Sequence, residues 1–376
     1  MTTPIAFVWD NFGPYTVDAV EAVAAVSGGP SLVIGIELFA ASGTYEWGRW
    51  EGQGYTHVTL FPGDRRGQIG TLAIARRIVA TIRAHRAQTV FLCHYAEPHI
   101  LLAATMLRML GKRVFVLSDS KFDDYPRHLR REIGKSLYMA PYQGGIAASP
   151  RCADYMRFLG VDPARIRLGY YGINLDRIRN ACDLPPAPGG HPFAERYFLS
   201  IARLVPKKNH AMMLEAYALY AARATSPRRL VLCGSGPLES VIRERTQALG
   251  IIDKVDILGN VPPAQIPGHV GRALALLLPS TEEQFGIVVV EAQAMGLPVI
   301  LSDNCGSRDR QVQGGINGFV VEPDNPEGMA TYMQWLDEDE ALWTDMSNAA
   351  LAAAERGSVR HFAAAVRDLA SPAVHD

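Results

Sequence analysis

The sequence predicts two doubly wound α/β domains that face each other across a cleft. The chain has 376 residues, which is more than one hydrophobic core usually serves. Short runs rich in β-branched residues alternate with longer amphipathic segments along its whole length, and this pattern is typical of parallel sheets covered by helices. Near the middle, residues 182–193 are dense in Pro and Gly and indicate a linker between the domains.

The apolar runs give the strands of each domain. In the first domain, residues 1–181, strands are predicted at 4–9, 31–38, 55–61, 89–93, 112–118, 145–149 and 165–171. In the second domain, residues 194–356, they are predicted at 197–202, 229–233, 254–259, 273–279, 297–302 and 318–322. Ligands of doubly wound sheets bind at the carboxyl ends of the strands, so functional residues are expected directly after these runs.

Composition excludes several classes of protein. A hydrophobic fraction of 48% and a charged fraction of 20% are those of a soluble globular protein. No apolar stretch approaches the ~18 residues that span a bilayer, and the N-terminus lacks the basic start of a signal peptide, so we expect a cytoplasmic location. The net charge of -1 gives no reason to expect nucleic acid as a partner. The five cysteines are scattered, and no metal site is predicted.

The first domain is mildly basic and contains one basic amphipathic helix. Residues 1–190 hold 21 Lys and Arg against 16 Asp and Glu. At 127–139 the pattern predicts a helix with Leu129, Ile133 and Leu137 on one stripe and basic residues around it. Such helices are more often packed on their own domain, whereas a peripheral membrane contact through Arg127–Lys135 is the alternative.

Two residues of the first domain follow strands. Gly13 and Pro14 form a tight turn into a helix that is predicted to begin near Thr16, and a glycine there lets the backbone approach a ligand. An ordinary strand-to-helix turn would explain the same residues. His94 ends the strand 89–93, where its imidazole would project into the cleft, and a hydrogen-bonded structural histidine is the alternative.

The loop after the first strand of the second domain carries two cationic residues. Arg203 and Lys208 lie between the strand 197–202 and a following helix, where a guanidinium and an ammonium suit a diphosphate, or are surface charges on a turn. The next strand ends at Gly234 and Gly236, but Glu239 occupies the third position of a dinucleotide fingerprint. We therefore do not expect NAD.

The stretch EEQFGIVVVE, 282–291, joins two predicted strands, so a helix is expected in it despite its apolar run. Good helix formers follow, and Gly296 and Pro298 end the segment. The N–H groups of Phe285, Gly286 and Ile287 then stand near a helix N-terminus, where they can bind a phosphate. Glu283 before the helix and Glu291 inside it can accept hydrogen bonds from sugar and ribose hydroxyls.

A second acidic pattern needs a different explanation. Asp337 and Asp339 form an Asp-x-Asp pattern, which binds a metal ion in some enzyme folds. They lie among polar, helix-forming residues far from any predicted strand end. The sequence therefore predicts a solvated helix junction at this position.

These motifs together resemble a known family. The segment PSTEEQFGIVVVEAQAMGLPVI is similar to the E-x7-E region of retaining glycosyltransferases with the GT-B fold, in glycosyltransferase family 4, group 1. RLVPKKN, LCGSGP, LGNVP and NGFVVEP resemble later elements of the same family. In the first half the resemblance is looser, and Tyr171 stands before Gly172 where the family usually has Asn.

The resemblance implies a role for each candidate residue. Arg203 and Lys208 would hold the leaving diphosphate, and Glu291 would bind the ribose. Glu283 and the backbone after Phe285 would position the donor sugar. The remaining candidates are a glycine turn at Gly234, a phosphate contact at Gly13 and a sugar hydroxyl contact at His94. A last helix, 357–376, would cross back to the first domain.

The resulting expectation is a retaining, metal-independent glycosyltransferase. It would move a hexose-like sugar from a nucleotide diphosphate, with UDP or GDP expected, to a glycan, lipid-linked or small-molecule acceptor, and it would need no cofactor. Two alternatives stay open. One is a sugar-nucleotide epimerase or hydrolase of the same fold, and the other is a sugar-nucleotide-binding protein without turnover.

Overall fold

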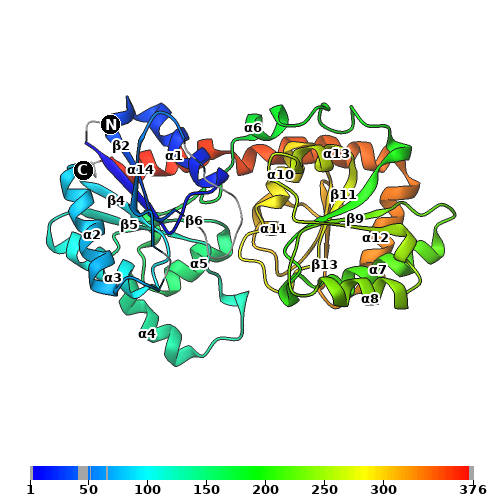
Figure 1. Ribbon diagram of the computed structural model, residues 1–376, viewed down its shortest axis with the longest axis horizontal. Coiled ribbons are helices and arrows are strands. Elements are labelled where there is room, and N and C mark those ends of the chain that lie inside the picture. Colours follow the sequence, from blue (N-terminus) through cyan, green and yellow to red (C-terminus); the bar gives the residue numbers. More distant parts are fainter. Residues whose placement is uncertain (1–2, 41–49, 51, 65–66, 372–376) are drawn as a thin grey trace. The chain divides into compact units, whose positions relative to one another are not determined.

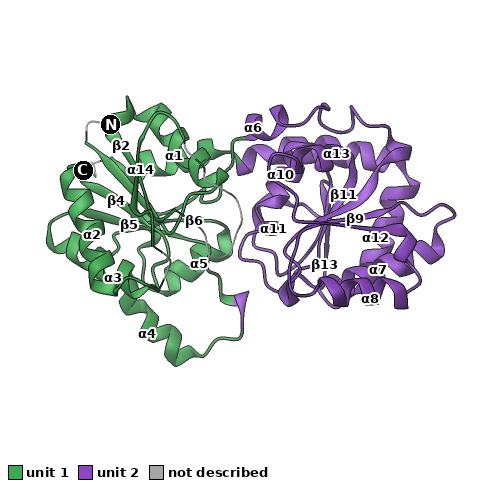
Figure 2. Ribbon diagram, viewed as in Figure 1, with its two compact units in different colours: residues 1–122, 126–174, 358–376 green, residues 123–125, 175–357 purple. Residues whose placement is uncertain are grey.

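The computed structural model of the protein describes residues 3–40, 50, 52–64 and 67–371. Its internal contacts divide the chain into two compact units, which Figure 2 colours green and purple. Unit 1 comprises residues 1–122, 126–174 and 358–376, and unit 2 comprises residues 123–125 and 175–357. Each unit has a parallel sheet of its own.

The described part of unit 1 holds a seven-stranded sheet in the order β3-β2-β1-β4-β5-β6-β7. Its strands are β1 (Ile5–Trp9), β2 (Val33–Phe39), β3 (Thr56–Phe61), β4 (Thr89–Leu92), β5 (Arg113–Ser118), β6 (Gly145–Ala147) and β7 (Ile166–Leu168). Its helices are α1 (Pro14–Ser27), α2 (Thr71–Ala84), α3 (Pro98–Met109), α4 (Leu129–Met139), α5 (Pro150–Phe158) and α14 (Val359–Ala370). Helix α1 packs against α14, and α2 packs against α3 (Figure 1).

The described part of unit 2 holds a six-stranded sheet in the order β10-β9-β8-β11-β12-β13. Its strands are β8 (Tyr197–Ile201), β9 (Leu230–Cys233), β10 (Val255–Gly259), β11 (Ala273–Leu278), β12 (Val299–Ser302) and β13 (Gly318–Val321). Its helices are α6 (Leu175–Asn180), α7 (His210–Arg223), α8 (Glu239–Ala248), α9 (Ile266–Gly271), α10 (Val288–Ala294), α11 (Arg308–Gln311), α12 (Pro326–Glu338) and α13 (Glu340–Ala354). Helix α7 packs against α12, and α10 packs against α13.

Both doubly wound sheets agree with the predicted fold class, and each predicted strand is present. The central strands β1, β4, β8 and β11 are almost wholly buried, which explains their continuous apolar runs. The strand order of unit 1 reverses between β1 and β4, and that of unit 2 reverses between β8 and β11. Open α/β sheets bind ligands at such a reversal, in the crevice beyond the carboxyl ends of the strands.

The chain changes unit earlier than the Pro- and Gly-rich segment. The division falls between residues 174 and 175, and residues 182–193 lie within unit 2. There the Ala187 N–H donates to the Met295 carbonyl (2.9 Å). The buried Arg196 guanidinium donates to the carbonyls of Gly189 (3.0 Å) and His191 (2.8 Å). Because prolines lack N–H donors, such a stretch needs partners from outside itself, and Arg196 supplies them.

After α13 the chain returns to unit 1. Residues 358–376 belong to that unit, and the Val359 N–H donates to the Ile173 carbonyl (3.0 Å). The ring of Phe362 in α14 lies 5.8 Å from that of Phe7 in β1, measured between centroids. The Arg113 guanidinium donates to the Ala370 carbonyl (2.7 Å) at the end of the helix. Helix α14 is therefore part of the core of unit 1.

Helix α4 forms where the basic amphipathic pattern predicted it, but its apolar stripe is not packed on unit 1. Leu129, Ile133 and Leu137 are 65%, 58% and 72% exposed. The buried face carries Glu132 instead, which accepts hydrogen bonds from Arg127 (3.2 Å) and Lys135 (2.9 Å). These partners outweigh the effect of burial and lower the pKa of Glu132. The expectation that the stripe packs inward was wrong, because this paired carboxylate takes its place.

Candidate functional site

The reversal of the unit 2 sheet brings two loops together. One loop, 202–209, follows β8 and contains Arg203 and Lys208, and the other, 279–287, follows β11 and contains Glu283. Backbone hydrogen bonds join the loops directly, because the Thr281 N–H donates to the Lys207 carbonyl (2.9 Å). The sequence placed these residues after strands, and the strand order makes those strands neighbours.

Lys208 and Glu283 form an ion pair at this point. The Lys208 ammonium donates to the Glu283 carboxylate, and each side chain is only 12% exposed. The Ser280 hydroxyl donates to the same carboxylate oxygen (3.2 Å). Two opposite charges so little exposed to water need each other, since a lone charge there would carry a large desolvation cost. A ligand with anionic oxygens would compete with Glu283 for the ammonium.

Asn209 is a residue of this site that the sequence analysis missed. Its backbone is left-handed (φ 56°), and its amide donates to the carbonyls of Pro279 (3.1 Å) and Pro323 (2.6 Å). Asn209 thereby ties the loop after β8 to those after β11 and β13, and holds Lys208 beside them. The available signal was an Asn directly before the predicted helix, since Asn favours both helix starts and left-handed backbone.

Gly234 supports the cationic loop from the side of β9. A Cβ at this position would lie 1.9 Å from the Ala202 carbonyl oxygen, and its φ is +152°. The Leu204 N–H donates to the Ser235 carbonyl (2.9 Å). Glycine is needed here because its backbone touches the backbone of Ala202. This contact fixes the start of the loop after β8 and therefore the position of Arg203. The Arg203 side chain is half-buried.

The loop before α10 is held by the loop after β12. The Gly306 N–H donates to the Glu283 carbonyl (3.0 Å), and the Ser307 N–H donates to the Phe285 carbonyl (2.8 Å). Gly286 has φ +85°, and a Cβ there would lie 2.9 Å from the Cys305 sulfur. The buried thiol of Cys305 also donates to the Phe285 carbonyl (3.1 Å). The backbone at 283–286 therefore has little freedom to move.

The helix predicted in the apolar run is confirmed as α10, Val288–Ala294. Ile287 is its N-terminal cap residue, and the left-handed Gly296 follows its end. Glu291 lies in the first turn and is half-buried, whereas Glu283 stands on the preceding loop. The two glutamates thus come from different parts of the connection, as the sequence indicated.

In unit 1, Gly13 and His94 lie on the two loops at the sheet reversal. Helix α1 begins at Pro14, two residues before the predicted start, and the Gly13 carbonyl accepts from the N–H of Thr16 (3.1 Å). The Phe12 N–H donates to the buried carboxylate of Glu37 (3.0 Å), which fixes this loop to β2. Glu37 was not singled out in the sequence, because a glutamate inside an apolar run gives no indication of its partner.

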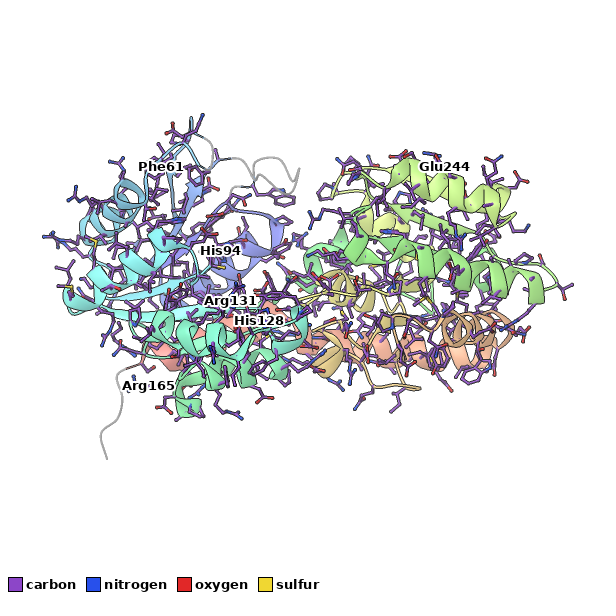
Figure 3. The ribbon with its side chains drawn as sticks, turned by 90° about the horizontal axis from the view of Figure 1, so that it is seen from below. Phe61, His94, His128, Arg131, Arg165 and Glu244 are labelled. Carbon is purple, nitrogen blue, oxygen red and sulfur yellow. The ribbon has the colours of Figure 1, made fainter. Side chains whose placement is uncertain are left out.

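His94 directly follows Cys93 at the end of β4 and is labelled in Figure 3. Its backbone is left-handed (φ 58°), which is uncommon for a residue other than glycine. The charge of Cys93, and further those of Asp10 and Asp119, raise the pKa of His94 to about 10 against the opposing effect of burial. Its side chain is exposed, and the carboxylates of Asp10 and Asp119 are the acidic groups that act on it. They favour an imidazolium at neutral pH.

Asp337 and Asp339 lie at the junction of α12 and α13. Asp339 caps α13 by accepting from the Leu342 N–H (2.9 Å). Asp337 differs from the prediction, because it is largely buried and accepts hydrogen bonds from Arg228 and Tyr220. The site is therefore a helix junction, but only Asp339 is solvated there. A pattern of polar residues does not reveal that one of them pairs with an arginine distant in the sequence.

Residues 186–352 match the model of the family described as glycosyl transferases group 1. Unit 2 is a glycosyl transferases group 1 domain. The expected family is thereby confirmed for this domain, which holds Lys208 and Glu283 at its sheet reversal. The match contains no residue of unit 1, and it leaves out residues 123–125, 175–185 and 353–357 of unit 2.

Two curated relatives of this chain are named glycosyltransferases. The D-inositol 3-phosphate glycosyltransferase of Streptomyces griseus is 29% identical over 67% of this chain and 58% of its own length. That of Streptomyces scabiei is 30% identical over 68% of this chain and 59% of its own length. The chain thus spans under two thirds of the length of these relatives.

Two solved structures share the fold over nearly the whole chain. A glycosyltransferase from Rickettsia africae has a TM-score of 0.72 at 17% identity, with 99% of this chain and 100% of that one covered. HepE from Anabaena, solved in complex with UDP, has a TM-score of 0.72 at 16% identity, with 97% and 99% covered. The two parallel sheets of this chain therefore form the expected GT-B fold.

Neither a membrane-spanning helix nor a metal-binding cluster is present in the described part of the chain. Within residues 3–40, 50, 52–64 and 67–371, no helix has the length and apolar character that crossing a membrane requires. In the same part of the chain, no three His, Cys, Asp or Glu side chains gather as they would around a metal ion.

Proposed function

We propose that the chain is a retaining glycosyltransferase that moves a hexose-like sugar from a nucleotide diphosphate to an acceptor. The observation that carries this proposal is the Lys208–Glu283 pair at the sheet reversal of the group 1 domain. A cation and a carboxylate on adjacent loops are the two groups that a nucleotide sugar requires, one for its diphosphate and one for its sugar hydroxyls.

Lys208 and Arg203 carry the charge chemistry of the proposal. Negative charge develops on the nucleoside diphosphate as the glycosidic bond breaks, and cations placed in advance stabilise it most in the transition state. Lys208 would exchange its Glu283 partner for a phosphate oxygen, and Arg203 would bind from the same loop. The exchange would also release the Glu283 carboxylate to accept from a sugar hydroxyl.

The other candidates are assigned supporting contacts. The backbone at Phe285, Gly286 and Ile287 would donate to the donor, and Glu291 would accept from the ribose hydroxyls. Gly234 would keep the cationic loop in place. From unit 1, Gly13 would approach the phosphates with its backbone, and His94 would donate to a hydroxyl of the donor sugar as an imidazolium.

UDP and GDP are the proposed donor nucleotides. HepE, which shares the fold, has been solved with UDP and with UDP-glucose. Thermal shift with UDP, GDP and ADP tests this directly, since a ligand at 100 times its dissociation constant stabilises a protein by ~2.7 kcal/mol. We expect one of the first two to raise the melting temperature; no shift with any of the three would contradict the proposal.

Nucleotide release distinguishes the proposed transfer from its alternatives. An epimerase or hydrolase turns the donor over at a rate that added acceptors do not change, and a binding protein raises its melting temperature without turnover. A transferase releases nucleotide faster with an acceptor. The proposed transfer needs no metal, so its rate in excess EDTA should equal that in buffer. Loss of activity in EDTA that manganese restores would show that a metal ion, and not Lys208 and Arg203, stabilises the charge of the leaving diphosphate.

The acceptor is proposed to bind mainly to unit 1, with glycan, lipid-linked and small-molecule acceptors as the candidates. For a lipid-linked acceptor, a peripheral contact with the inner face of the cytoplasmic membrane would follow from helix α4. Its exposed stripe, Leu129, Ile133 and Leu137, is flanked by the exposed Arg130 and Arg131. Apolar side chains beside cations suit an anionic bilayer surface, where each basic residue contributes about 1 kcal/mol.

Flotation with vesicles of phosphatidylglycerol and phosphatidylcholine tests this contact. We expect binding at low salt that is lost at high salt and in a Leu129→Ser, Ile133→Ser, Leu137→Ser variant. A Val241→Ser, Ile252→Ser variant, which alters exposed residues of unit 2, is the matched control. Equal flotation of the α4 variant and the control would remove α4 from the proposal, and so would wild-type protein that does not float.

A further inference from the structure

Unit 1 contains a cluster of aromatic and carboxylate side chains that the donor contacts do not use. Tyr171 follows β7, Asp119 follows β5, and Tyr15 lies in the first turn of α1 after β1. All three stand at the carboxyl edge of the sheet, and all three are half-buried. The Tyr171 hydroxyl donates to the Asp119 carboxylate (2.9 Å), and the Tyr15 and Tyr171 rings meet edge to face with centroids 6.0 Å apart.

The backbone at Tyr171 is in an unfavourable conformation. Its φ of +63° is left-handed, which is unfavourable for a residue with a side chain. The family that the sequence resembles usually has Asn at this position, and Asn tolerates a left-handed backbone. Here a bulky aromatic residue occupies it, and the adjoining Ile173 is held by hydrogen bonding of its carbonyl to Val359 in α14. Strain of this kind at a ligand-facing edge is characteristic of functional positions.

The Tyr171 ring is held in place by the neighbouring ring of Tyr170. It stacks on Tyr170 with ring centroids 4.2 Å apart and an interplanar angle of 21°. Tyr170 is buried, and its hydroxyl accepts from the Trp9 indole N–H (3.2 Å) and hydrogen-bonds with the Cys93 sulfur (3.1 Å). Because Tyr170 is fixed by these contacts, the ring that rests on it is fixed as well. A rigid aromatic surface beside a carboxylate loses little conformational entropy when a ligand binds.

We propose that Tyr171, Tyr15 and Asp119 form a subsite for the neutral, hydroxyl-bearing ring of the acceptor. This inference rests on the proposed glycosyl transfer and names the chemical class of its second substrate. The aromatic rings pack against the C–H groups of a pyranose or cyclitol, and Asp119 accepts from its hydroxyls in charge-assisted hydrogen bonds. The carboxylate of Asp10, which follows β1, stands at the same edge of the sheet. A phosphate directly beside the Asp119 carboxylate would be repelled, so the ring that packs on Tyr171 carries hydroxyls and no phosphate at this point.

Ligand-observed NMR of the full chain with soluble probes tests the subsite. The probes are methyl α-D-glucopyranoside and myo-inositol, with D-inositol 3-phosphate for comparison, each in the presence of the nucleotide, UDP or GDP, that raises the melting temperature. We expect saturation transfer to the ring protons of the two neutral probes and about 10-fold weaker binding of the phosphorylated one. Asp119→Asn should weaken binding of the neutral probes about 10-fold or more, the effect of a lost hydrogen bond to a charged group.

Tyr171→Asn and Tyr171→Phe separate the ring from the hydroxyl. Tyr171→Asn suits the left-handed backbone and should fold, yet it removes the ring, so we expect several-fold weaker binding; Tyr171→Phe should bind more tightly than Tyr171→Asn. Tyr138→Asn changes an exposed tyrosine of α4 and is the control. Neutral probes that bind Tyr171→Asn as they bind wild type, or that do not bind wild type, overturn the subsite. A missing thermal shift with UDP, GDP and ADP alike would instead contradict the proposed donor site, which makes the two failures distinguishable.

Discussion

At the scale of single residues, Lys208 is the group on which the proposed chemistry depends most. It is paired with Glu283 and only 12% exposed, so its charge acts in surroundings from which most water is excluded. We predict that Lys208→Ala lowers the rate of sugar transfer roughly 100- to 1000-fold, the effect of removing one preorganised electrostatic donor, with a smaller change in donor affinity. Lys254→Ala, in the same unit, is the control. Normal turnover of Lys208→Ala would show that another group stabilises the leaving diphosphate.

His210, the first residue of α7, makes stability depend on pH. Burial, and in addition the nearby Lys208 charge, lower the pKa of His210 to about 4 from an unfolded value of about 6.5. Between these values the unfolded chain binds more protons than the folded one, so stability falls as the pH falls from 6.5 towards 4. The contribution amounts to about 2 kcal/mol between pH 7 and pH 5.

A His210→Gln variant measures this contribution. We expect its urea midpoint to fall less between pH 7 and pH 5 than that of the wild type, because glutamine does not titrate. Protonation of carboxylates at low pH destabilises both proteins equally, so this effect cancels in the comparison. The same pH dependence in both proteins would show that His210 is not held neutral in the fold.

At the scale of elements, Arg196 holds several segments of unit 2 together. Its guanidinium donates to the carbonyls of Gly271 (3.1 Å), Ala273 (2.9 Å), Gly189 (3.0 Å) and His191 (2.8 Å) and lies 4.6 Å from the Trp343 ring centroid. Arg196→Met would leave these buried carbonyls without a donor. We predict a loss of ~3–5 kcal/mol in unfolding free energy, measured by urea denaturation.

The exposed Arg243 provides the matched control for Arg196. It pairs with Glu239 one turn away on α8, and such surface pairs contribute at most about 1 kcal/mol. Arg243→Met should therefore leave the midpoint nearly unchanged. Two variants with equal losses would mean that the carbonyls around Arg196 find other partners.

The elements also show what the sequence could and could not predict. The strands could be predicted because continuous β-branched runs are typical of buried parallel strands. Helix α10 could be predicted because the connection between two parallel strands normally contains a helix. The inverted packing of α4 could not be found, since an amphipathic pattern does not say that Glu132 will be buried with Arg127 and Lys135. Similarly, Asn209 and Asp337 depend on partners distant in the sequence, and those pairings exist only once the strands are in order.

At the scale of the whole molecule, two separate cores predict two unfolding units, with α14 in the core of unit 1. The aromatic contact between Phe362 and Phe7 and the hydrogen bonds of Arg113 to the helix end are its anchors. We predict that a chain ending at Gly357 loses the unit 1 transition or unfolds it at lower temperature, while the transition raised by the donor nucleotide, UDP or GDP, remains. Calorimetry measures both. A truncated chain with an unchanged unit 1 transition would show that α14 adds nothing to that core.

The proposed reaction of the chain is transfer of a sugar from a nucleotide diphosphate with retention at the anomeric carbon. Time-resolved proton NMR follows it most directly, with UDP-glucose or GDP-mannose as donor and methyl α-D-glucopyranoside and myo-inositol as acceptors. We expect release of the nucleotide together with a new α-anomeric signal, both lost in Lys208→Ala and kept in Lys254→Ala. A β-linked product, or donors that remain intact with every acceptor, would contradict it.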